Sequence, residues 1–324
     1  MKRSVLVVLV LVMALPALAA TLGTAANAVI PADVQQIISV DYRRVNNSET
    51  AMALKARVLP DNLKQFETAL KGIGINVDSE MDNLTFVSYR VPKPSEQAQG
   101  GEAKPQPATL KVMGIASGQF GRPRVVTRIQ KKGIKPTIYR KSAIYPMGNG
   151  MEMAFLDDWT LVFGDSAAVK NALQTRDGAK ASLNSNSQVT DLIQSVSGGA
   201  VWSVLDADGT RNMMRSALGD AASLADYDTV KKRLLGSHYT MDFSNGVNFD
   251  LNVLTADNMT AATLSSLVKA GVMYRRMNAK GPEQYALENT SVESDSSTLK
   301  VHFKSDDKRF QSLLQSELFA AVSH

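Results

Sequence analysis

The segment MAFLDDWTLVFGDSAAVKNAL, residues 153–173, decides the fold prediction. Apolar residues occupy every second position on both sides of two adjacent acids: Met151, Met153 and Phe155 precede Asp157 and Asp158, and Trp159, Leu161 and Phe163 follow them. A period of two predicts strands, and aspartate tolerates tight-turn conformations, so we predict a β-hairpin with both acids in its turn. A helix is predicted next, capped at Gly164-Asp165-Ser166, with Val169, Ala172 and Leu173 facing inward.

A similar segment lies near the C-terminus. SVESDSSTLKVHFKSDDKRFQSLL, residues 291–314, predicts a hairpin with its turn at Asp295-Ser296-Ser297 and a helix that starts near Ser305-Asp306. This second segment keeps one acid at the turn and lacks the other. We therefore interpret Asp157 and Asp158 as turn residues. A catalytic acid pair is the weaker alternative, because it needs two environments that separate the pKa values of the acids.

These two segments close what we interpret as two copies of one degenerate repeat. The first copy is predicted at residues 30–178 and the second at residues 181–319, each with the element order α-β-α-α-β-β-α-β-β-α. Strands outnumber the crossover helices of a doubly wound fold, which predicts an α+β fold with helices packed on mostly antiparallel sheets. The sequence leaves open whether the copies form separate domains or halves of one sheet.

Periodicity and turn signals predict the remaining elements. Helices are expected at residues 32–37, 49–57, 120–134, 188–196, 210–218, 226–235 and 260–272, and around Leu63, Phe66 and Leu70, with Gly133 and Gly271 as helix stops. Strands are expected at residues 37–44, 84–91, 110–120, 200–206, 238–244 and 247–255. Residues 92–109 are rich in Pro, Gly, Gln and Glu, which predicts a disordered insertion within the hairpin of strands 84–91 and 110–120.

The N-terminus predicts export. Lys2 and Arg3 precede an apolar run, residues 5–15, which is too short to span a membrane. Ala17-Leu18-Ala19 follows this run and is typical of a signal-peptidase site. We therefore predict a signal peptide at residues 1–19, cleaved after Ala19, and a periplasmic or extracellular protein without a transmembrane span after cleavage.

Composition excludes several classes of protein. The chain has 324 residues, 44% of them hydrophobic, which is enough for a large core. It has no cysteine, which excludes disulfides, thiolate metal sites and a thiol nucleophile. The formal net charge of +5 is too mild for a dedicated nucleic-acid binder, so we predict no nucleic-acid partner.

Local motifs of catalysis are absent from the sequence. The three histidines, His238, His302 and His324, form no pair at ligand spacing, and neither HExxH nor GxSxG occurs. The run Asp206-Ala207-Asp208-Gly209 lacks the further oxygen ligands of a calcium loop and predicts a strand-to-helix turn. We therefore predict no enzymatic activity, no catalytic residues, no cofactor and no metal site.

Residues 122–141, which we call the basic segment, are the most polarised part of the chain. The segment holds eight cations and no acid: Arg122, Arg124, Arg128, Lys131, Lys132, Lys135, Arg140 and Lys141. Such a cluster favours contact with anionic lipid headgroups, an acidic polysaccharide or an acidic protein. The alternative is a solvated helix face and strand with counter-charges from elsewhere in the fold.

The order of these features resembles that of exported bacterial proteins that carry duplicated α+β units. The similar features are the signal peptide, Ile-Pro-Ala-Asp at residues 30–33, the Phe-Leu-Asp-Asp-Trp hairpin and its capped helix. The resemblance implies a fold and an exported location, and it implies no activity. With the basic segment, it leads to the hypothesis of a non-catalytic exported binding protein whose partner is a protein, a polysaccharide or an anionic lipid surface.

Two other hypotheses follow from the sequence. Met213, Met214, Met273 and Met277 either fill the core or line a flexible apolar pocket, and a pocket would indicate a carrier of a lipid-like ligand. A hydrolase requires two of Asp157, Asp158, Asp206 and Asp208 to converge in a polar cleft.

Overall fold

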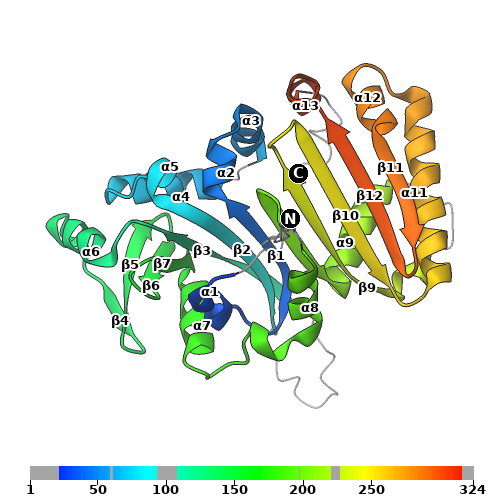
Figure 1. The fold of residues 1–324 in the computed structure, drawn as a ribbon. Helices are drawn as coiled ribbons and strands as arrows, with labels where there is room; N and C mark the ends of the chain where they lie inside the picture. The colour runs from blue at the N-terminus through cyan, green and yellow to red at the C-terminus, as the bar shows by residue number, and fades with distance from the viewer. Residues whose placement is uncertain (1–21, 59–60, 93–107, 197, 220–226, 316–324) are drawn as a thin grey trace, which may run out of the picture.

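One antiparallel sheet of twelve strands runs through the molecule, in the order β11-β12-β10-β9-β8-β1-β2-β3-β7-β6-β5-β4 (Figure 1). The computed structural model describes residues 22–58, 61–92, 108–196, 198–219 and 227–315. The predicted signal peptide and most of the predicted insertion lie outside these residues. Helices pack on the sheet, so the predicted α+β fold class is confirmed.

The first half of the molecule extends from α1 to α7. Its helices are α1 (Thr24–Val29), α2 (Tyr42–Asn46), α3 (Glu49–Val58), α4 (Asp61–Gly72), α5 (Val77–Glu80), α6 (Arg122–Lys131) and α7 (Ser166–Arg176). Its strands are β1 (Val34–Asp41), β2 (Met81–Val91), β3 (Thr109–Gly118), β4 (Thr137–Tyr139), β5 (Ser142–Gly148), β6 (Met151–Phe155) and β7 (Thr160–Asp165).

The second half extends from α8 to α13, after a short 3-10 helix, η1 (Leu183–Ser185). Its helices are α8 (Ser187–Ser195), α9 (Ala207–Leu218), α10 (Tyr227–Lys231), α11 (Asn258–Asn278), α12 (Pro282–Glu288) and α13 (Asp307–Leu314). Its strands are β8 (Val201–Asp206), β9 (Leu234–Asp242), β10 (Val247–Thr255), β11 (Thr290–Asp295) and β12 (Thr298–Ser305).

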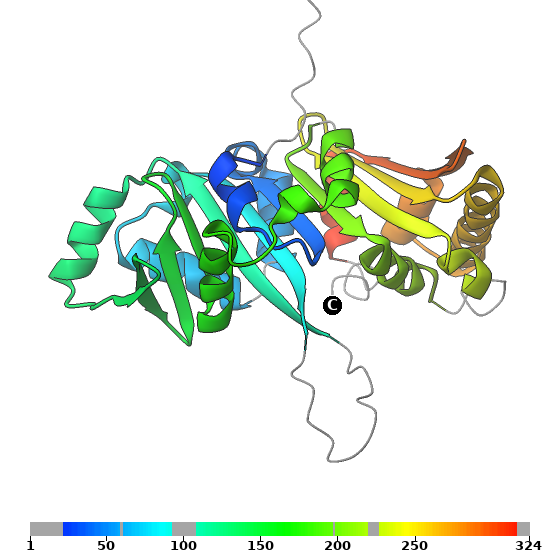
Figure 2. The same ribbon diagram turned by 90° about the horizontal axis from the view of Figure 1, so that it is seen from below.

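Antiparallel pairing of β1 with β8 joins the two halves into one sheet, with Ile38 opposite Ser203 near the middle. Outward from this seam the strands run β1-β2-β3-β7-β6 in one half and β8-β9-β10-β12-β11 in the other. The two orders match strand for strand when β4 and β5 are set aside. α6 and α11 occupy corresponding places after the third strand and lie at opposite ends of the molecule (Figures 1 and 2).

The hairpin prediction for Asp157 and Asp158 is confirmed. β6 pairs with β7 from Met151 opposite Asp165 to Phe155 opposite Leu161, which leaves both acids in the connecting turn. The Asp157 side chain accepts a hydrogen bond from the backbone N–H of Trp159 at 2.8 Å. Asp165 caps α7 by accepting the Ala168 N–H at 2.7 Å, and Asp306 caps α13 in the same way in the second half.

Several predicted elements differ from the structure. Residues 32–37, expected as a helix, contain the start of β1, because Ile37 pairs with both β2 and β8 and is fully buried. α10 ends at Lys231, and Leu234 already begins β9, so the helix expected at residues 226–235 is shorter. Gly271 does not end α11, because Val268 and Val272 on either side of it both pack on the core. At Ile37 and at Gly271, long-range packing therefore outweighs the short-range sequence pattern.

The sequence prediction also missed the β4–β5 hairpin, which adds two strands to the first half. β2 and β3 pair as far as Val91 opposite Thr109, so the chain leaves and re-enters the sheet at one hairpin end, as expected for an insertion.

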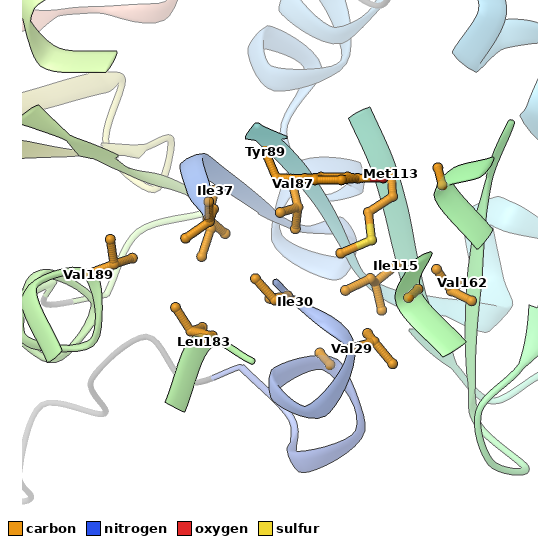
Figure 3. Close-up of a cluster of buried hydrophobic side chains, with 14 of the residues drawn as sticks. Val29, Ile30, Ile37, Val87, Tyr89, Met113, Ile115, Val162, Leu183 and Val189 are labelled. Carbon is orange, nitrogen blue, oxygen red and sulfur yellow. The ribbon is translucent and has the colours of Figure 1, made fainter. Parts of the chain in front are cut away.

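Both faces of the sheet are covered in the first half. α1 and α7 pack on one face, where Val29 and Ile30 point toward Val87, Met113 and Ile115 (Figure 3). α4 and α6 pack on the other face through Phe66, Leu70, Val125 and Ile129. In the second half, α9, α10 and α11 cover one face, and α13 packs on α3 at the seam. The basic segment therefore sits on a fixed core at the free end of the first half.

Candidate functional site

The structure divides the basic segment among α6, the loop that follows it and the β4–β5 turn. Arg122 begins α6, and the next four cations lie along this helix and at its C-cap, Lys132. Lys135 lies in the loop that follows. Arg140 and Lys141 form the two-residue turn that joins β4 to β5.

Arg124 and Arg128 attach α6 to the rest of the first half. The Arg124 guanidinium donates to the Phe120 carbonyl at 2.9 Å and 3.1 Å and pairs with Glu80, and Arg128 donates to the Gly74 carbonyl. Partial burial raises the pKa of Glu80, but the Asn76 N–H and Arg124 outweigh burial and hold this pKa below its usual range. For Arg124 the counter-charge alternative describes the structure, whereas Arg128 is engaged by a neutral backbone carbonyl.

Five other cations of the basic segment behave differently. Arg122, Lys131, Lys132, Lys135 and Lys141 are exposed, and among the described residues their side chains have no hydrogen-bond or ion-pair partner. Unpaired cations concentrated at one end of a molecule create a positive potential there. These five are the part of the basic segment that is available to an anionic partner.

A hollow of about 600 Å³ opens between the start of α6, the β4–β5 turn and the end of α7. Four cations line it, Arg122, Arg140, Lys141 and Arg176, together with one carboxylate, Asp177. Tyr145 and Phe155 also line it, and each is only 6% exposed. The hollow is about twice the volume of a shallow one of about 310 Å³ beside Asp250 and His302.

Arg176 was missed by sequence reasoning. It ends α7, 35 residues beyond Lys141, and no local pattern connects it to the basic segment. Its guanidinium donates to Asp177 at 2.9 Å and to the Ser142 hydroxyl at 3.0 Å, which fixes it beside the β4–β5 turn. Only the folding of α7 against the sheet brings it to the hollow.

The β4–β5 turn has an unusual backbone. Arg140 and Lys141 have φ angles of 45° and 63°, both in the left-handed region. A two-residue hairpin with this geometry usually contains Asn-Gly, because larger L-residues are strained there. Arg140 lies 3.9 Å from Asp177, and hydrogen bonds with Gln174 and Arg140 lower the pKa of the Tyr139 hydroxyl. The turn thus presents two adjacent cations at the mouth of the hollow, at a cost in backbone strain.

The four aspartates of the hydrolase hypothesis lie in two separate places. Asp157 and Asp158 precede β7, whereas Asp206 ends β8 and Asp208 lies in the first turn of α9. Four strand spacings separate β7 from β8, which is about 19 Å across the sheet. Asp206 and Asp208 do converge, but on Arg90, at 2.7 Å and 2.9 Å.

These two acids have structural roles. Asp206 accepts the Gly209 N–H at 2.8 Å and so caps α9, which confirms the predicted strand-to-helix turn. A hydrogen bond from Arg211 lowers the pKa of Asp208. A lowered pKa is the opposite of what a general acid requires at neutral pH.

The histidines also make contacts that the sequence did not predict. His302 Nδ1 lies 2.7 Å from Asp250, and Ser291 lies opposite His302 on the neighbouring strand. The His302 and Asp250 side chains are about half exposed on an open sheet face, which is a solvated row of polar groups. Burial lowers the pKa of His238, whose Nδ1 lies 2.8 Å from Ser195 Oγ.

His324 lies outside the described residues. Within the described ranges, no three His, Cys, Asp or Glu side chains lie close enough together to hold a metal ion.

The methionines divide into two groups. Met214 is buried and Met213 packs beside it in the core, whereas Met273 and Met277 of α11 are 71% and 80% exposed. A core role is therefore wrong for the second pair. The small hollow beneath α1, about 100 Å³ in volume, is lined by polar Asn83, Thr85 and Thr160 as well as apolar groups, which does not match a site for a lipid-like ligand.

Comparison with known proteins gives no family for the chain. No family model matches it, and no curated protein matches it. Crystal forms I and III of TP0453 are similar structures, each 9% identical in sequence, with TM-scores of 0.45 and 0.43. The matches cover 89% of this chain and 95% and 96% of those chains. A likeness at this level carries no argument about function. In the part of the chain that the structure describes, every helix is too short or too polar to cross a bilayer.

Proposed function

We propose that this chain is a non-catalytic, exported binding protein of the bacterial cell envelope, and that its basic segment contacts an anionic lipid surface. The observation that supports this proposal most directly is the group of five exposed, unpaired cations at one end of the molecule. Clustered cations that reach a membrane surface are attracted to anionic headgroups. The predicted signal peptide supports the exported location.

Two exposed apolar side chains favour a membrane over a polysaccharide. Ile138, next to the Arg140 turn, is 68% exposed, and Trp159 of the β6–β7 turn is 57% exposed. The backbone of this turn contacts α6, because the Asp158 carbonyl accepts the Arg122 N–H at 3.0 Å. Tryptophan beside cations suits the headgroup region of a bilayer, where an apolar ring and a polar edge are both satisfied.

Vesicle binding tests the proposal. We expect the protein to sediment with vesicles that contain about 30% anionic phospholipid and not to sediment with neutral vesicles. Each cation near the surface strengthens binding about fivefold, so changing Lys131, Lys132, Lys135 and Lys141 together to glutamine is expected to weaken it several-hundredfold.

A matched control carries the same loss of charge in the second half of the molecule, away from the basic segment. Lys269, Lys280, Lys304 and Lys308 are exposed in the second half, and their change to glutamine is expected to leave vesicle binding within about twofold. Equal weakening by both quadruple variants would mean that only net charge matters, and the proposal would fail. Binding to an acidic polysaccharide but not to vesicles would contradict the choice of a membrane.

A further inference from the structure

We infer that the hollow between α6, the β4–β5 turn and α7 is a discrete binding site for a phosphate monoester that carries an apolar substituent. This inference deepens the proposed function, because it rests on that proposal for the anionic character of the partner and adds a ligand class and a defined site. The argument has three parts: the balance of charge, the positioning of the cations and the composition of the hollow's lining.

The charge balance of the hollow favours a multiply charged anion. Its one carboxylate, Asp177, is already engaged by Arg176 at 2.9 Å and by Arg140 at 3.9 Å. Arg122 and Lys141 line the hollow without any side-chain partner among the described residues. A carboxylate ligand neutralises one of these two cations, whereas a phosphate monoester near neutral pH carries enough charge for both.

Positioning of the cations favours a tetrahedral oxyanion. Arg176 is held by Asp177 on one side and by Ser142 on the other, so its guanidinium edge is fixed. The Arg140-Lys141 turn is held in a conformation that L-residues rarely adopt. Fixed guanidinium groups match phosphate oxygens with paired hydrogen bonds, and a mobile lysine adds a point charge.

The lining of the hollow favours an organic phosphate over inorganic phosphate. Tyr145 and Phe155 line it beside the cations, with their ring centroids 6.5 Å apart in an edge-on arrangement. Because each of these rings is only 6% exposed, the partly exposed Ala143 and Leu156 also supply apolar surface to the hollow. A volume of about 600 Å³ lies within the range of small-molecule sites and far exceeds a bare phosphate ion. The apolar surface is therefore available to a substituent on the phosphate.

Calorimetric titration with phenyl phosphate and with inorganic phosphate tests the inference. Phenyl phosphate is expected to bind at least about tenfold more tightly, because only it covers the apolar surface. Lys141→Gln and Arg176→Gln are each expected to weaken phenyl phosphate binding about tenfold. Lys141 is exposed and without a partner, so its variant reports on binding even if Arg176→Gln disturbs the end of α7.

Lys132→Gln is the matched control, because Lys132 belongs to the basic segment and does not line the hollow. It is expected to weaken vesicle binding and to leave phenyl phosphate binding unchanged. No binding of phenyl phosphate, equal affinity for both phosphates, or equal effects of Lys132→Gln and Lys141→Gln would each overturn the inference.

Vesicle assays separate this inference from the proposed function. If the protein binds anionic vesicles but not phenyl phosphate, the proposed surface contact stands and the discrete phosphate site is refuted. If the protein binds phenyl phosphate but no vesicles, the discrete site stands and the membrane contact fails. That outcome would identify a free phosphate ester as the ligand. Competition by phenyl phosphate against vesicles of phosphatidic acid, but not against those of phosphatidylglycerol, would identify a lipid phosphomonoester.

Discussion

Replacing Phe310 by alanine tests whether the two halves of the molecule unfold as one unit. Phe310 lies on α13, in the second half, and is 4% exposed. It belongs to the same cluster as Val45 and Ala51 of the first half, and its ring centroid lies 6.3 Å from that of Phe303. The same interface contains a 2.5 Å hydrogen bond from Thr50 to Asp307. The substitution therefore removes a contact that crosses the seam.

The size of the effect follows from burial and chain length. Loss of a buried phenylalanine side chain costs about 3–5 kcal/mol. The entropy of unfolding is about 2.1 cal/mol/K per residue, or about 0.6 kcal/mol/K for a chain of about 300 residues. The midpoint of thermal unfolding is therefore expected to fall by about 5–8 °C.

Scanning calorimetry and circular dichroism measure this shift, and tryptophan fluorescence follows Trp159 in the first half and Trp202 at the seam. We expect one transition that coincides for all probes and moves as a whole in Phe310→Ala. Met277→Ala, at an 80% exposed position, is the control and is expected to shift the midpoint by less than about 1 °C. Two transitions of which only one moves, or a fall of under about 2 °C, would refute the argument that the seam couples both halves.

Two further predictions concern the first half. A Cβ atom at Gly118 would lie 2.0 Å from the Glu80 carbonyl oxygen, so Gly118→Ala is expected to lower the free energy of unfolding by about 1–3 kcal/mol or more. A Cβ atom at Gly72 meets no atom within 4 Å, so Gly72→Ala is the control and is expected to be neutral or slightly stabilising. Equal denaturation midpoints for the two variants would contradict this prediction. Burial raises the pKa of Asp165, but hydrogen bonds and charge from Lys111 and the α7 N–H groups outweigh burial, so this pKa is lowered in the folded protein. The stability that Asp165 contributes is therefore present above its unfolded pKa of about 4 and is lost as the pH falls below that value. Asp165→Ala is expected to cost about 1 kcal/mol at pH 7 and progressively less toward pH 2 in urea titrations, and a pH-independent cost would count against this account.

Much of the fold was predictable from local sequence. The alternation around Asp157 and Asp158 identified β6, β7 and the cap of α7, because side-chain periods and turn chemistry act over only a few residues. The failures have a common cause. Residues 32–37 and Gly271 carry local signals that packing overrides, since Ile37 lies between two strands and Val268 and Val272 near Gly271 pack on the core.

The candidate site was half predictable. The basic segment is visible as a run of cations, but the sequence did not separate Arg124 and Arg128, which bind the Phe120 and Gly74 carbonyls, from the unpaired lysines. It also gave no reason to connect Arg176 with Lys141. The depth of the hollow and its aromatic lining depend on contacts between residues distant in the chain.

Sequence alone determined the fold class, the absence of cysteine chemistry, the architectural role of the Asp157-Asp158 hairpin and the location of the positive charge, because composition and short-range periodicity are properties of neighbouring residues. Only the tertiary structure showed that β1 and β8 pair to make a single sheet. It also showed that some cations, such as Arg128, make structural contacts, and that others line a hollow together with Arg176. Strand pairing across the seam and the convergence of these side chains depend on contacts between residues distant in the chain. The free energy of such contacts cannot be inferred from a short stretch of sequence.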